Sequence, residues 1–337
     1  MATNNPEAPV VLQVEDLKLH YFTSKGAVRA LDGLTFNLHK GETLGLVGES
    51  GCGKTTTGVA LLNMPSPPGR IVGGKCIVDG IDVVGLPDKK LRREVRWTRI
   101  AMVFQGAMNC LTPVYTIREL MQETYREHRD GWDKADCEAR MTKYVALVGL
   151  PSHVLDRYPH ELSGGMKQRI VIAMALFLEP HVVIMDEPTT ALDVIVQAQI
   201  LNLIKDLKKK LGLAAIFITH DLATEAEVAD RILVMYAGKA VEVGTNDQVF
   251  GPVGPSHPYS QKLLAATPRL HQKVDHLDFI AGSPPDLIAP PPGCRFAPRC
   301  PFAKDKCRQV EPVMTEIEPR HAVACWKAIK DTEYERS

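Results

Sequence analysis

The spacing of hydrophobic residues predicts two antiparallel strands near the start of the chain. Apolar and polar side chains alternate between residues 10 and 21, and they alternate again between residues 34 and 38. Alternation with a period of two indicates a strand that buries only one of its faces. A turn containing Gly26 separates the two runs. We therefore expect an antiparallel sheet at one edge of the fold.

Further along, short apolar runs without alternation predict strands that are buried on both faces. They cover residues 43–47, 100–104, 182–185, 214–219 and 231–236. Helical patterns lie between them, at residues 55–62, 166–178, 194–211 and 222–229. Strands that alternate with helices favour a parallel sheet in an α/β fold.

A second helical zone separates the strand at residues 100–104 from Ser163. From residue 116 to residue 149 apolar side chains recur at three- and four-residue spacings, as at Ile117, Leu120 and Met121. This period indicates amphipathic helices. We expect a helical subdomain over about residues 106–165, inserted into the α/β domain.

Composition and charge narrow the class of protein. The chain has 337 residues, and its 40 lysines and arginines balance its 40 aspartates and glutamates. A nucleic-acid binder should carry a basic excess, so we expect no nucleic-acid partner. No apolar run approaches the ~20 residues of a membrane span, and the first residues lack the pattern of a signal peptide. We expect a cytoplasmic protein that is soluble or peripheral to a membrane.

The composition changes near residue 250. Residues 251–258 are rich in glycine and proline, a short helical pattern covers residues 259–266, and residues 284–292 hold five prolines. Such a change indicates the end of a globular domain. We expect one α/β domain over residues 1–250 and a small irregular C-terminal domain over residues 251–337.

A glycine-rich loop follows the apolar run at residues 43–47. Its sequence, GESGCGKT, fits G-x-x-x-x-G-K-[ST] and precedes a helical pattern. Glycines let successive backbone N–H groups surround phosphate oxygens, the lysine neutralises phosphate charge, and the hydroxyl reaches Mg²⁺. The positive end of the helix dipole adds to this attraction. The predicted nucleotide-binding residues are Gly48, Glu49, Ser50, Gly51, Cys52, Gly53, Lys54, Thr55 and Thr56.

Polar side chains end three of the predicted buried strands. Gln105 follows one strand, Asp186 and Glu187 follow the next, and His220 follows a third. Each has a plain structural explanation by itself, because a polar residue at a strand end often only contacts solvent. In open α/β sheets, however, ligands bind beyond the carboxyl ends of the strands. Their convergence there favours a catalytic site.

Further motifs identify a family. Residues 162–168 read LSGGMKQ, residues 182–187 read VVIMDE, and residues 191–193 read ALD. These three segments resemble the signature, the Walker B motif and the D-loop of an ABC transporter ATPase subunit. The glycine-rich loop, Gln105 and His220 resemble its Walker A motif, Q-loop and switch histidine. Tyr21 falls where that family stacks an aromatic ring on adenine. The resemblance covers about residues 10–250. It implies a P-loop NTPase of the ABC type with an antiparallel edge subdomain and a helical subdomain.

The resemblance also implies a role for each motif. ATP binds the glycine-rich loop, and Thr55, Asp186 and Gln105 hold Mg²⁺. Glu187 polarises the attacking water, and His220 and Gln105 orient the water and the γ-phosphate. In this family the signature and D-loop residues contact the nucleotide of the opposite subunit, so one chain does not complete its own site. Here those residues are Ser163, Gly164, Gly165 and Asp193.

The rest of the chain resembles a narrower group. The segment Ser256-His257-Pro258-Tyr259 and the later run GCRFAPRCPFAKDKC are similar to segments of oligopeptide and dipeptide importer ATPases, in particular their D-type subunits. This implies a homologous F-type ATPase partner, two transmembrane permeases and an extracytoplasmic solute-binding protein, at the cytoplasmic face of the cell membrane. Related systems import nickel or oligosaccharides, which leaves the solute open. The remaining alternative is a soluble ABC protein of DNA repair or translation.

Four of the eight cysteines lie close together near the end of the chain. They are Cys294, Cys300, Cys307 and Cys325, with five, six and seventeen residues between them. This spacing alone leaves a [4Fe–4S] cluster, a zinc ion and unmetallated thiols open, although zinc sites usually show tighter pairs. The resemblance to peptide-importer ATPases favours the [4Fe–4S] cluster. A structural clamp is favoured over a redox sensor, because the segment has little apolar content with which to fold alone.

Overall fold

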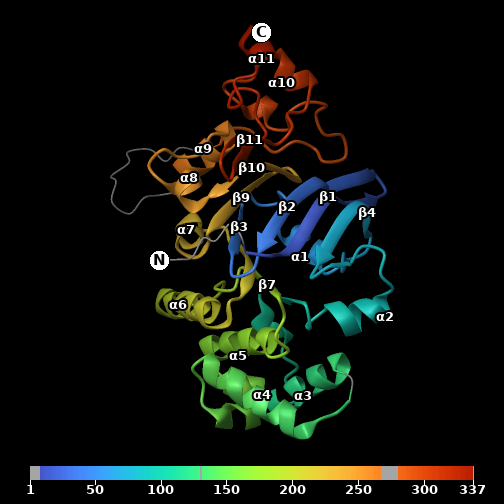
Figure 1. Ribbon diagram of the computed structural model, residues 1–337, viewed down its shortest axis with the longest axis vertical. Helices are drawn as coiled ribbons and strands as arrows, with labels where there is room; N and C mark the ends of the chain where they lie inside the picture. The colour runs from blue at the N-terminus through green and yellow to red at the C-terminus, as the bar shows by residue number, and fades with distance from the viewer. Residues whose placement is uncertain (1–7, 130, 267–279, 337) are drawn as a thin grey trace.

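The computed structural model describes residues 8–129, 131–266 and 280–336. Figure 1 shows an elongated molecule with a group of helices at one end and two sheets in the middle. The described residues from 251 onward, which we name the C-terminal region, occupy the other end (Figure 1). The antiparallel sheet and the parallel strands predicted from the sequence are both present.

The first sheet is antiparallel, as the alternation in the sequence predicts. Its strands are β1 (Val10–Thr23), β2 (Gly26–His39), β4 (Gly69–Val78) and β5 (Ile81–Asp82), in the order β2-β1-β4-β5. In β1 the side chains of Leu12, Val14, Leu17 and Leu19 are fully buried. They share one hydrophobic core with apolar residues of the second sheet such as Leu46. The alternating face therefore attaches this subdomain to the rest of the fold.

The second sheet contains the five parallel strands. They are β3 (Thr43–Val47), β6 (Ile100–Val103), β7 (Val182–Asp186), β8 (Ala214–Ile218) and β9 (Arg231–Tyr236). The whole sheet has the order β11-β12-β10-β9-β3-β8-β7-β6. Every residue of β3, β6, β7 and β8 is buried, which is the environment that their unbroken apolar runs predict.

Helices connect and cover these parallel strands. They are α1 (Lys54–Leu61), α5 (Gly164–Leu176), α6 (Val194–Leu211) and α7 (Leu222–Val228). The bounds of α6 are those that the sequence pattern predicts. Asp193 caps its first turn by accepting a hydrogen bond from the Val196 N–H, and Gly212 ends it in the left-handed conformation that glycine adopts most easily. Shorter elements are α2 (Asp88–Lys90), the π-helical turn Leu91–Val95 and the 3₁₀ turn Ala107–Cys110.

The predicted helical subdomain consists of two main helices, α3 (Ile117–His128) and α4 (Lys134–Leu147), with 3₁₀ turns at Ser152–Asp156 and Pro159–Glu161. Thr116 and Glu119 form a capping box at the start of α3, and Asp133 caps α4. Buried side chains of both helices share a hydrophobic core with α5 and β7. Figure 1 shows α3, α4 and α5 together at the end of the molecule opposite the C-terminus.

The C-terminal region joins the second sheet, which the sequence pattern did not predict. Its elements are α9 (Pro258–Ala265), the 3₁₀ turn Ala297–Arg299, α10 (Asp305–Gln309), β11 (Thr315–Glu318), β12 (His321–Val323) and α11 (Thr332–Arg336). Before it come β10 (Lys239–Thr245) and α8 (Asn246–Phe250). Strand β12 pairs with β10, and Tyr259 and Phe296 share a hydrophobic core with Tyr236 of β9. The C-terminal region is thus packed against the α/β domain.

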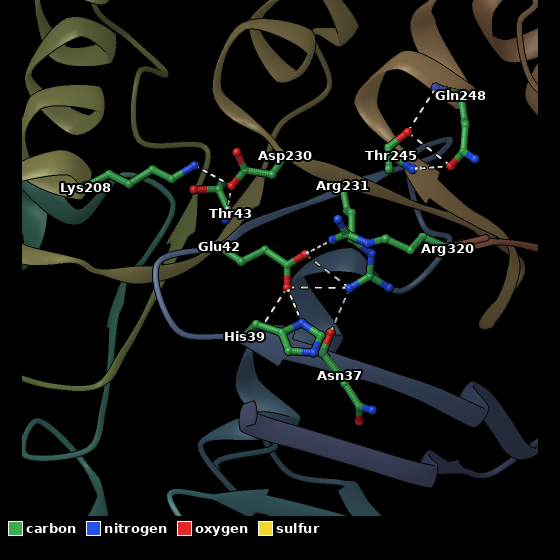
Figure 2. Close-up of polar contacts among 10 residues, drawn as sticks. All are labelled: Asn37, His39, Glu42, Thr43, Lys208, Asp230, Arg231, Thr245, Gln248 and Arg320. Atoms are coloured by element: carbon green, nitrogen blue, oxygen red, sulfur yellow. Dashed lines mark hydrogen bonds and ion pairs between the residues drawn. The ribbon is translucent and has the colours of Figure 1, made fainter. Parts of the chain in front are cut away.

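A buried carboxylate at Glu42 links three parts of the molecule (Figure 2). It accepts hydrogen bonds from the N–H and ring Nδ1 of His39 in β2, and it pairs with Arg231 of β9 and Arg320 of the C-terminal region at 3.3 Å each. Burial raises the pKa of Glu42, but the charge of Arg231 and the hydrogen bonds from His39 lower it overall. The ionised form is therefore the native one.

Candidate functional site

The glycine-rich loop connects β3 to α1 in the order that the motif requires. At Gly48, where φ is +151°, a Cβ atom would lie 2.2 Å from the Met235 carbonyl oxygen. At Gly53, the residue before α1, φ is +111° and a Cβ atom would lie 2.8 Å from the Ala30 oxygen. Neither position has room for a side chain, and both backbone angles favour glycine. The loop path therefore depends on these two residues.

The lysine of the loop is held in place by the loop itself. Lys54 is buried, and its ammonium group donates to the carbonyl oxygens of Gly48 at 2.7 Å and Glu49 at 3.2 Å. A lysine ammonium group fixed beside a glycine-rich loop that precedes a helix provides a site for phosphate. Of the other loop residues, Ser50, Gly51 and Thr55 are exposed, Thr56 is half-buried, and Cys52 is buried.

Asp186, at the end of β7, has the environment of a metal ligand. Both carboxylate oxygens are buried, and neither makes a hydrogen bond of ordinary geometry. Burial raises the pKa of Asp186 and the neighbouring Glu187 raises it further, while Thr55 and Lys54 act in the opposite direction. A buried carboxylate without a strong partner is costly unless a cation satisfies it. These residues fit Mg²⁺, for which Asp186 and Thr55 supply the oxygen donors that the ion prefers.

Glu187 is the meeting point of the three strand ends. Its carboxylate accepts a hydrogen bond from Gln105 Nε2 at 2.7 Å and lies 3.2 Å from His220 Nδ1. The three residues follow β6, β7 and β8. Glu187 itself has φ +47°, a conformation that costs energy for a non-glycine residue and is common at active sites. The convergence that the sequence predicts is therefore present.

Sequence reasoning missed a further partner of Glu187. The Thr190 hydroxyl donates a hydrogen bond to Glu187 Oε2 at 2.9 Å, the same carboxylate oxygen that Gln105 contacts. Thr190 stands three residues after the glutamate, in a turn where Thr190 N–H also donates to the Glu187 carbonyl oxygen. The run Pro188-Thr189-Thr190 carries two threonines, and only the turn geometry distinguishes the one that bonds the carboxylate.

The signature segment lies away from the glycine-rich loop of its own chain. Ser163 caps α5, and the neighbours of the two signature glycines are Met108, Leu192 and Val196. None of these neighbours belongs to the glycine-rich loop. Asp193 caps α6. The structure thus places Ser163 and Asp193 at the starts of two contacting helices, α5 and α6, and the side chains nearest to Gly164 and Gly165 come from outside the glycine-rich loop.

Tyr21 lies within a strand. It is a residue of β1, opposite Val28 of β2 and Gly69 of β4, and its ring is so close to Gly69 that a Cβ atom there would lie 2.7 Å from it. The sequence pattern predicted a strand ending at residue 21, but pairing continues to Thr23. Its ring is half-buried, which leaves part of it accessible to a ligand.

The C-terminal region reaches the glycine-rich loop directly. The Tyr259 hydroxyl oxygen accepts a hydrogen bond from the Glu49 N–H at 2.8 Å, and the Arg299 guanidinium binds both carboxylate oxygens of Glu49 at 2.7 and 2.9 Å. Tyr259 belongs to the His-Pro-Tyr segment, and Arg299 immediately precedes Cys300. Both segments stand out in the sequence, but no pattern in it connects them with the loop.

The four C-terminal cysteines share one pocket, but the predicted metal centre is not supported. Cys294, Cys300, Cys307 and Cys325 all line a pocket that encloses about 20 Å³, which is room for about one water molecule. Within the described ranges no group of three or more His, Cys, Asp or Glu side chains is arranged to hold a metal ion. Burial raises the pKa of Cys294 to about 12, which favours the protonated thiol.

No helix in the described part of the chain has the length and apolar character that crossing a membrane requires.

Comparisons with known proteins agree with this geometry. Residues 31–190 match the ABC transporter family, and residues 241–307 match the C-terminal region of oligopeptide/dipeptide transporters. The chain is 44% identical over 329 residues to the probable peptide ABC transporter ATP-binding protein y4tR of Sinorhizobium fredii, covering 96% of this chain and 97% of the relative. It is 44% identical over 319 residues to the dipeptide transport ATP-binding protein DppD of Bacillus subtilis, covering 94% of each.

An F-type protein and a solved structure are also similar. The chain is 42% identical over 330 residues to the oligopeptide transport ATP-binding protein OppF of Salmonella typhimurium, covering 94% of this chain and 96% of the relative. The dimeric structure of MJ0796, a bacterial ABC transporter cassette, matches with a TM-score of 0.61 and 26% identity over 70% of this chain and 98% of that chain. The chain therefore belongs to the ABC transporter family, as an ATPase subunit of its oligopeptide/dipeptide transporter branch.

Proposed function

We propose that this protein hydrolyses ATP to drive the uptake of dipeptides and oligopeptides through membrane permeases, bound peripherally at the cytoplasmic face of the membrane. The observation that carries the proposal is the convergence of Gln105, His220 and Glu187 at the strand ends that follow the phosphate loop. Peptide transport is the function in the names of several relatives, which supports the choice of solute.

Each residue of this site has a role in the proposed reaction. Lys54 and the N–H groups of the glycine-rich loop hold the phosphates, and Thr55, Asp186 and Gln105 hold Mg²⁺. Glu187 accepts a proton from the attacking water, while Gln105 and His220 orient that water. Phosphoryl transfer depends mainly on positioning and on neutralising charge, which these groups supply. Tyr21 is proposed to stack on adenine.

The ATP site is proposed to be completed by a second subunit. Ser163, Gly164, Gly165 and Asp193 would contact the nucleotide held by the opposite glycine-rich loop. Three features support this: their neighbours come from outside the loop of their own chain, His220 is 74% exposed, and Val194 and Ile195 beside Asp193 are exposed. Two similar solved structures, both of the ATP-binding cassette MJ0796, are dimers. We propose that the second subunit is a homologous F-type ATPase.

The other proposed partners are two permeases and an extracytoplasmic solute-binding protein. The exposed apolar side chains of Phe104, Val114 and Tyr115 flank the loop after Gln105 and suit a contact with a membrane subunit. Movement of this loop would change the position of Gln105 and so connect the permease to hydrolysis. We also propose a two-part organisation, with the nucleotide-binding domain in residues 1–250 and the C-terminal domain in residues 251–337.

Reconstitution tests the proposed function. The chain would be purified with its permeases and ATPase partner, placed in vesicles, and supplied with ATP and the binding protein. We expect accumulation of a labelled tripeptide that stops when ATP is omitted. Stimulation of ATP hydrolysis by nickel or by an oligosaccharide, without stimulation by peptides, would assign a different solute to the same ATPase. ATP-independent uptake would contradict the proposal.

We further propose that the four C-terminal cysteines are ligands of a [4Fe–4S] cluster. Four thiols on one pocket are the donor set that such clusters use. Because the pocket is small, the four cysteines would have to move apart to bind the cluster. Iron and acid-labile sulfide analysis on protein purified without oxygen tests this, with about four of each expected per chain. One zinc ion without sulfide, or no metal at all, would contradict it.

A further inference from the structure

Glu49 is held at three points by groups from different parts of the chain. Its N–H donates to the Tyr259 hydroxyl oxygen at 2.8 Å, and its carbonyl oxygen accepts from Lys54 at 3.2 Å. Its carboxylate is bound by both terminal nitrogens of Arg299, at 2.7 and 2.9 Å. A bidentate pair of this kind fixes orientation as well as distance. The second residue of the phosphate loop is thus fixed in position by the C-terminal region.

The two side chains that hold Glu49 are themselves fixed. The Tyr259 ring is fully buried and lies 4.5 Å, centroid to centroid, from the Tyr236 ring. The Arg299 side chain is 5% exposed. Its remaining N–H groups donate to the carbonyl oxygens of Ile280 and Ala281 at 2.8 and 2.9 Å and to the Tyr236 hydroxyl oxygen at 3.2 Å. Groups that are locked by packing and further hydrogen bonds can hold another residue accurately.

The charge of Glu49 explains why an arginine is placed there. A phosphate loop attracts anions through its N–H groups and its lysine, and a free carboxylate within it would repel a triphosphate. The guanidinium neutralises that carboxylate through two hydrogen bonds. Arg299 therefore affects both the position and the charge of the loop. It does so without itself belonging to the loop.

We propose that Arg299 and Tyr259 are positioning residues of the nucleotide site, through which the C-terminal region sets the affinity of its own subunit for ATP. The inference rests on the proposed function, because it assumes that the glycine-rich loop binds ATP. Arg299 is adjacent to Cys300, and the turn between Cys294 and Cys300 is closed by hydrogen bonds from Ala297 N–H and Cys300 N–H. The chain that lines the cysteine pocket therefore lies next to the group that holds Glu49.

Equilibrium binding of a fluorescent ATP analogue to the purified full-length chain tests the proposal. For Arg299→Gln we expect the dissociation constant to rise about tenfold, within the roughly 5–150-fold range of coupling between protein sites. In the assembled transporter the same variant should raise the KM for ATP and leave kcat nearly unchanged. Arg299→Lys keeps the charge but not the bidentate geometry. Its dissociation constant should lie between those of the unaltered chain and Arg299→Gln.

A double variant distinguishes positioning through Glu49 from a general structural effect. Glu49→Gln removes the carboxylate that Arg299 neutralises, so adding it to Arg299→Gln should restore most of the lost affinity. Arg320→Gln is the matched control, since Arg320 also joins the C-terminal region to the α/β domain, at Glu42, but does not touch the loop. It should leave the dissociation constant unchanged.

Three results would overturn the inference. They are an unchanged dissociation constant in Arg299→Gln, a defect of equal size with and without Glu49→Gln, or an equal defect in Arg320→Gln. Tyr259→Phe keeps the packed ring and removes only the acceptor, so it provides a second test if Arg299→Gln does not fold. It should weaken binding by about threefold, and an unchanged affinity would contradict the role of Tyr259. Failure of the unaltered chain to bind ATP would instead overturn the proposed function.

Discussion

Two carboxylates are held in different ways: Glu187 in the site at the strand ends, which we name the strand-end site, and Glu49, which the C-terminal region holds in the glycine-rich loop. Glu187 is bound by Gln105, Thr190 and His220, which all belong to loops after neighbouring strands, and its partners are partly exposed. Glu49 is bound by side chains 210 and 250 residues further along the chain, both buried. The partners of Glu187 are thus accessible to water and to a second subunit, whereas the partners of Glu49 are enclosed by the rest of the chain. The comparison suggests that hydrolysis and nucleotide affinity are controlled by separate regions.

The largest expected effect comes from Glu187→Gln. An amide cannot accept a proton from water, so hydrolysis should fall by about 100-fold or more, while the glycine-rich loop and Asp186 keep nucleotide binding intact. Rapid-quench kinetics and equilibrium ATP binding on the assembled transporter measure the two separately. Hydrolysis at the normal rate would show that Glu187 is not the base. The strand-end site would then not be the region that controls hydrolysis.

The next effect concerns Glu242 in β10, which anchors the C-terminal region. It is fully buried and accepts hydrogen bonds from the N–H groups of Ser256 and His257 and from the His321 ring at 2.8 Å. Glu242→Gln should lower the free energy of unfolding by about 3 kcal/mol, because a buried charged network is broken. Chemical denaturation measures the loss, with the exposed Glu318→Gln as the control.

Glu242 also predicts a dependence on pH. Burial raises its pKa, but the hydrogen bonds from His321 and the backbone lower it overall below the value of 4.5 in the unfolded chain. The stability that it contributes is therefore present above about pH 4.5 and is lost as the pH falls through the lower folded value. The unaltered chain should lose stability on acidification more steeply than Glu242→Gln. Parallel curves would contradict this assignment.

A smaller effect on stability, opposite in sign to that of Glu242→Gln, is expected at Glu225 in α7. Its carboxyl group is fully buried against Gly45, neither oxygen has a hydrogen-bond partner of ordinary geometry, and burial raises its pKa well above 4.5. Since the unfolded chain ionises first, stability should fall as the pH rises above about 4.5. Glu225→Gln should raise stability by about 1–2 kcal/mol at pH 8 and remove that fall. Thermal unfolding across pH checks both statements, and a destabilised variant would refute them.

The smallest effect is expected at Thr190. Removing one hydrogen bond to Glu187 should lower kcat by about two- to tenfold and leave the KM for ATP unchanged. Thr189→Ala is the matched control, because Thr189 is also half-buried and is not a partner of Glu187. Steady-state hydrolysis by the two variants decides the matter. A raised KM in Thr190→Ala would mean that the strand-end site also affects affinity, which would weaken the comparison.

The sequence predicts the strand-end site well because its parts are local. An unbroken apolar run identifies β7, and the residues that end it are Asp186 and Glu187. Parallel strands meet at one edge, so the positions of Gln105 and His220 follow from the order of elements. The bounds of α6 were predicted correctly for a similar reason, since a helical pattern begins after Asp193 and ends at Gly212.

The C-terminal contacts could not be predicted in this way. Strands β11 and β12 have only four and three residues, too few to show alternation. Arg299 pairs with Glu49 across 250 positions of the sequence. The periodic patterns used for prediction relate only residues close together in the sequence, so they do not indicate this pair. Thr190 was missed because its neighbour Thr189 has the same side chain, and the turn alone decides which hydroxyl meets Glu187.

The pairing of β12 with β10 has a consequence for shortened chains. In the full chain β10 has β9 on one side and β12 on the other, so both of its sides are hydrogen-bonded. A chain cut after residue 250 would leave one side of β10 as an open edge, with unpaired N–H and C=O groups beside the apolar Val241 and Val243. Open edges of this kind recruit strands from other copies. We therefore expect a chain that ends there to aggregate, in addition to losing the contacts that Tyr259 and Arg299 make with Glu49.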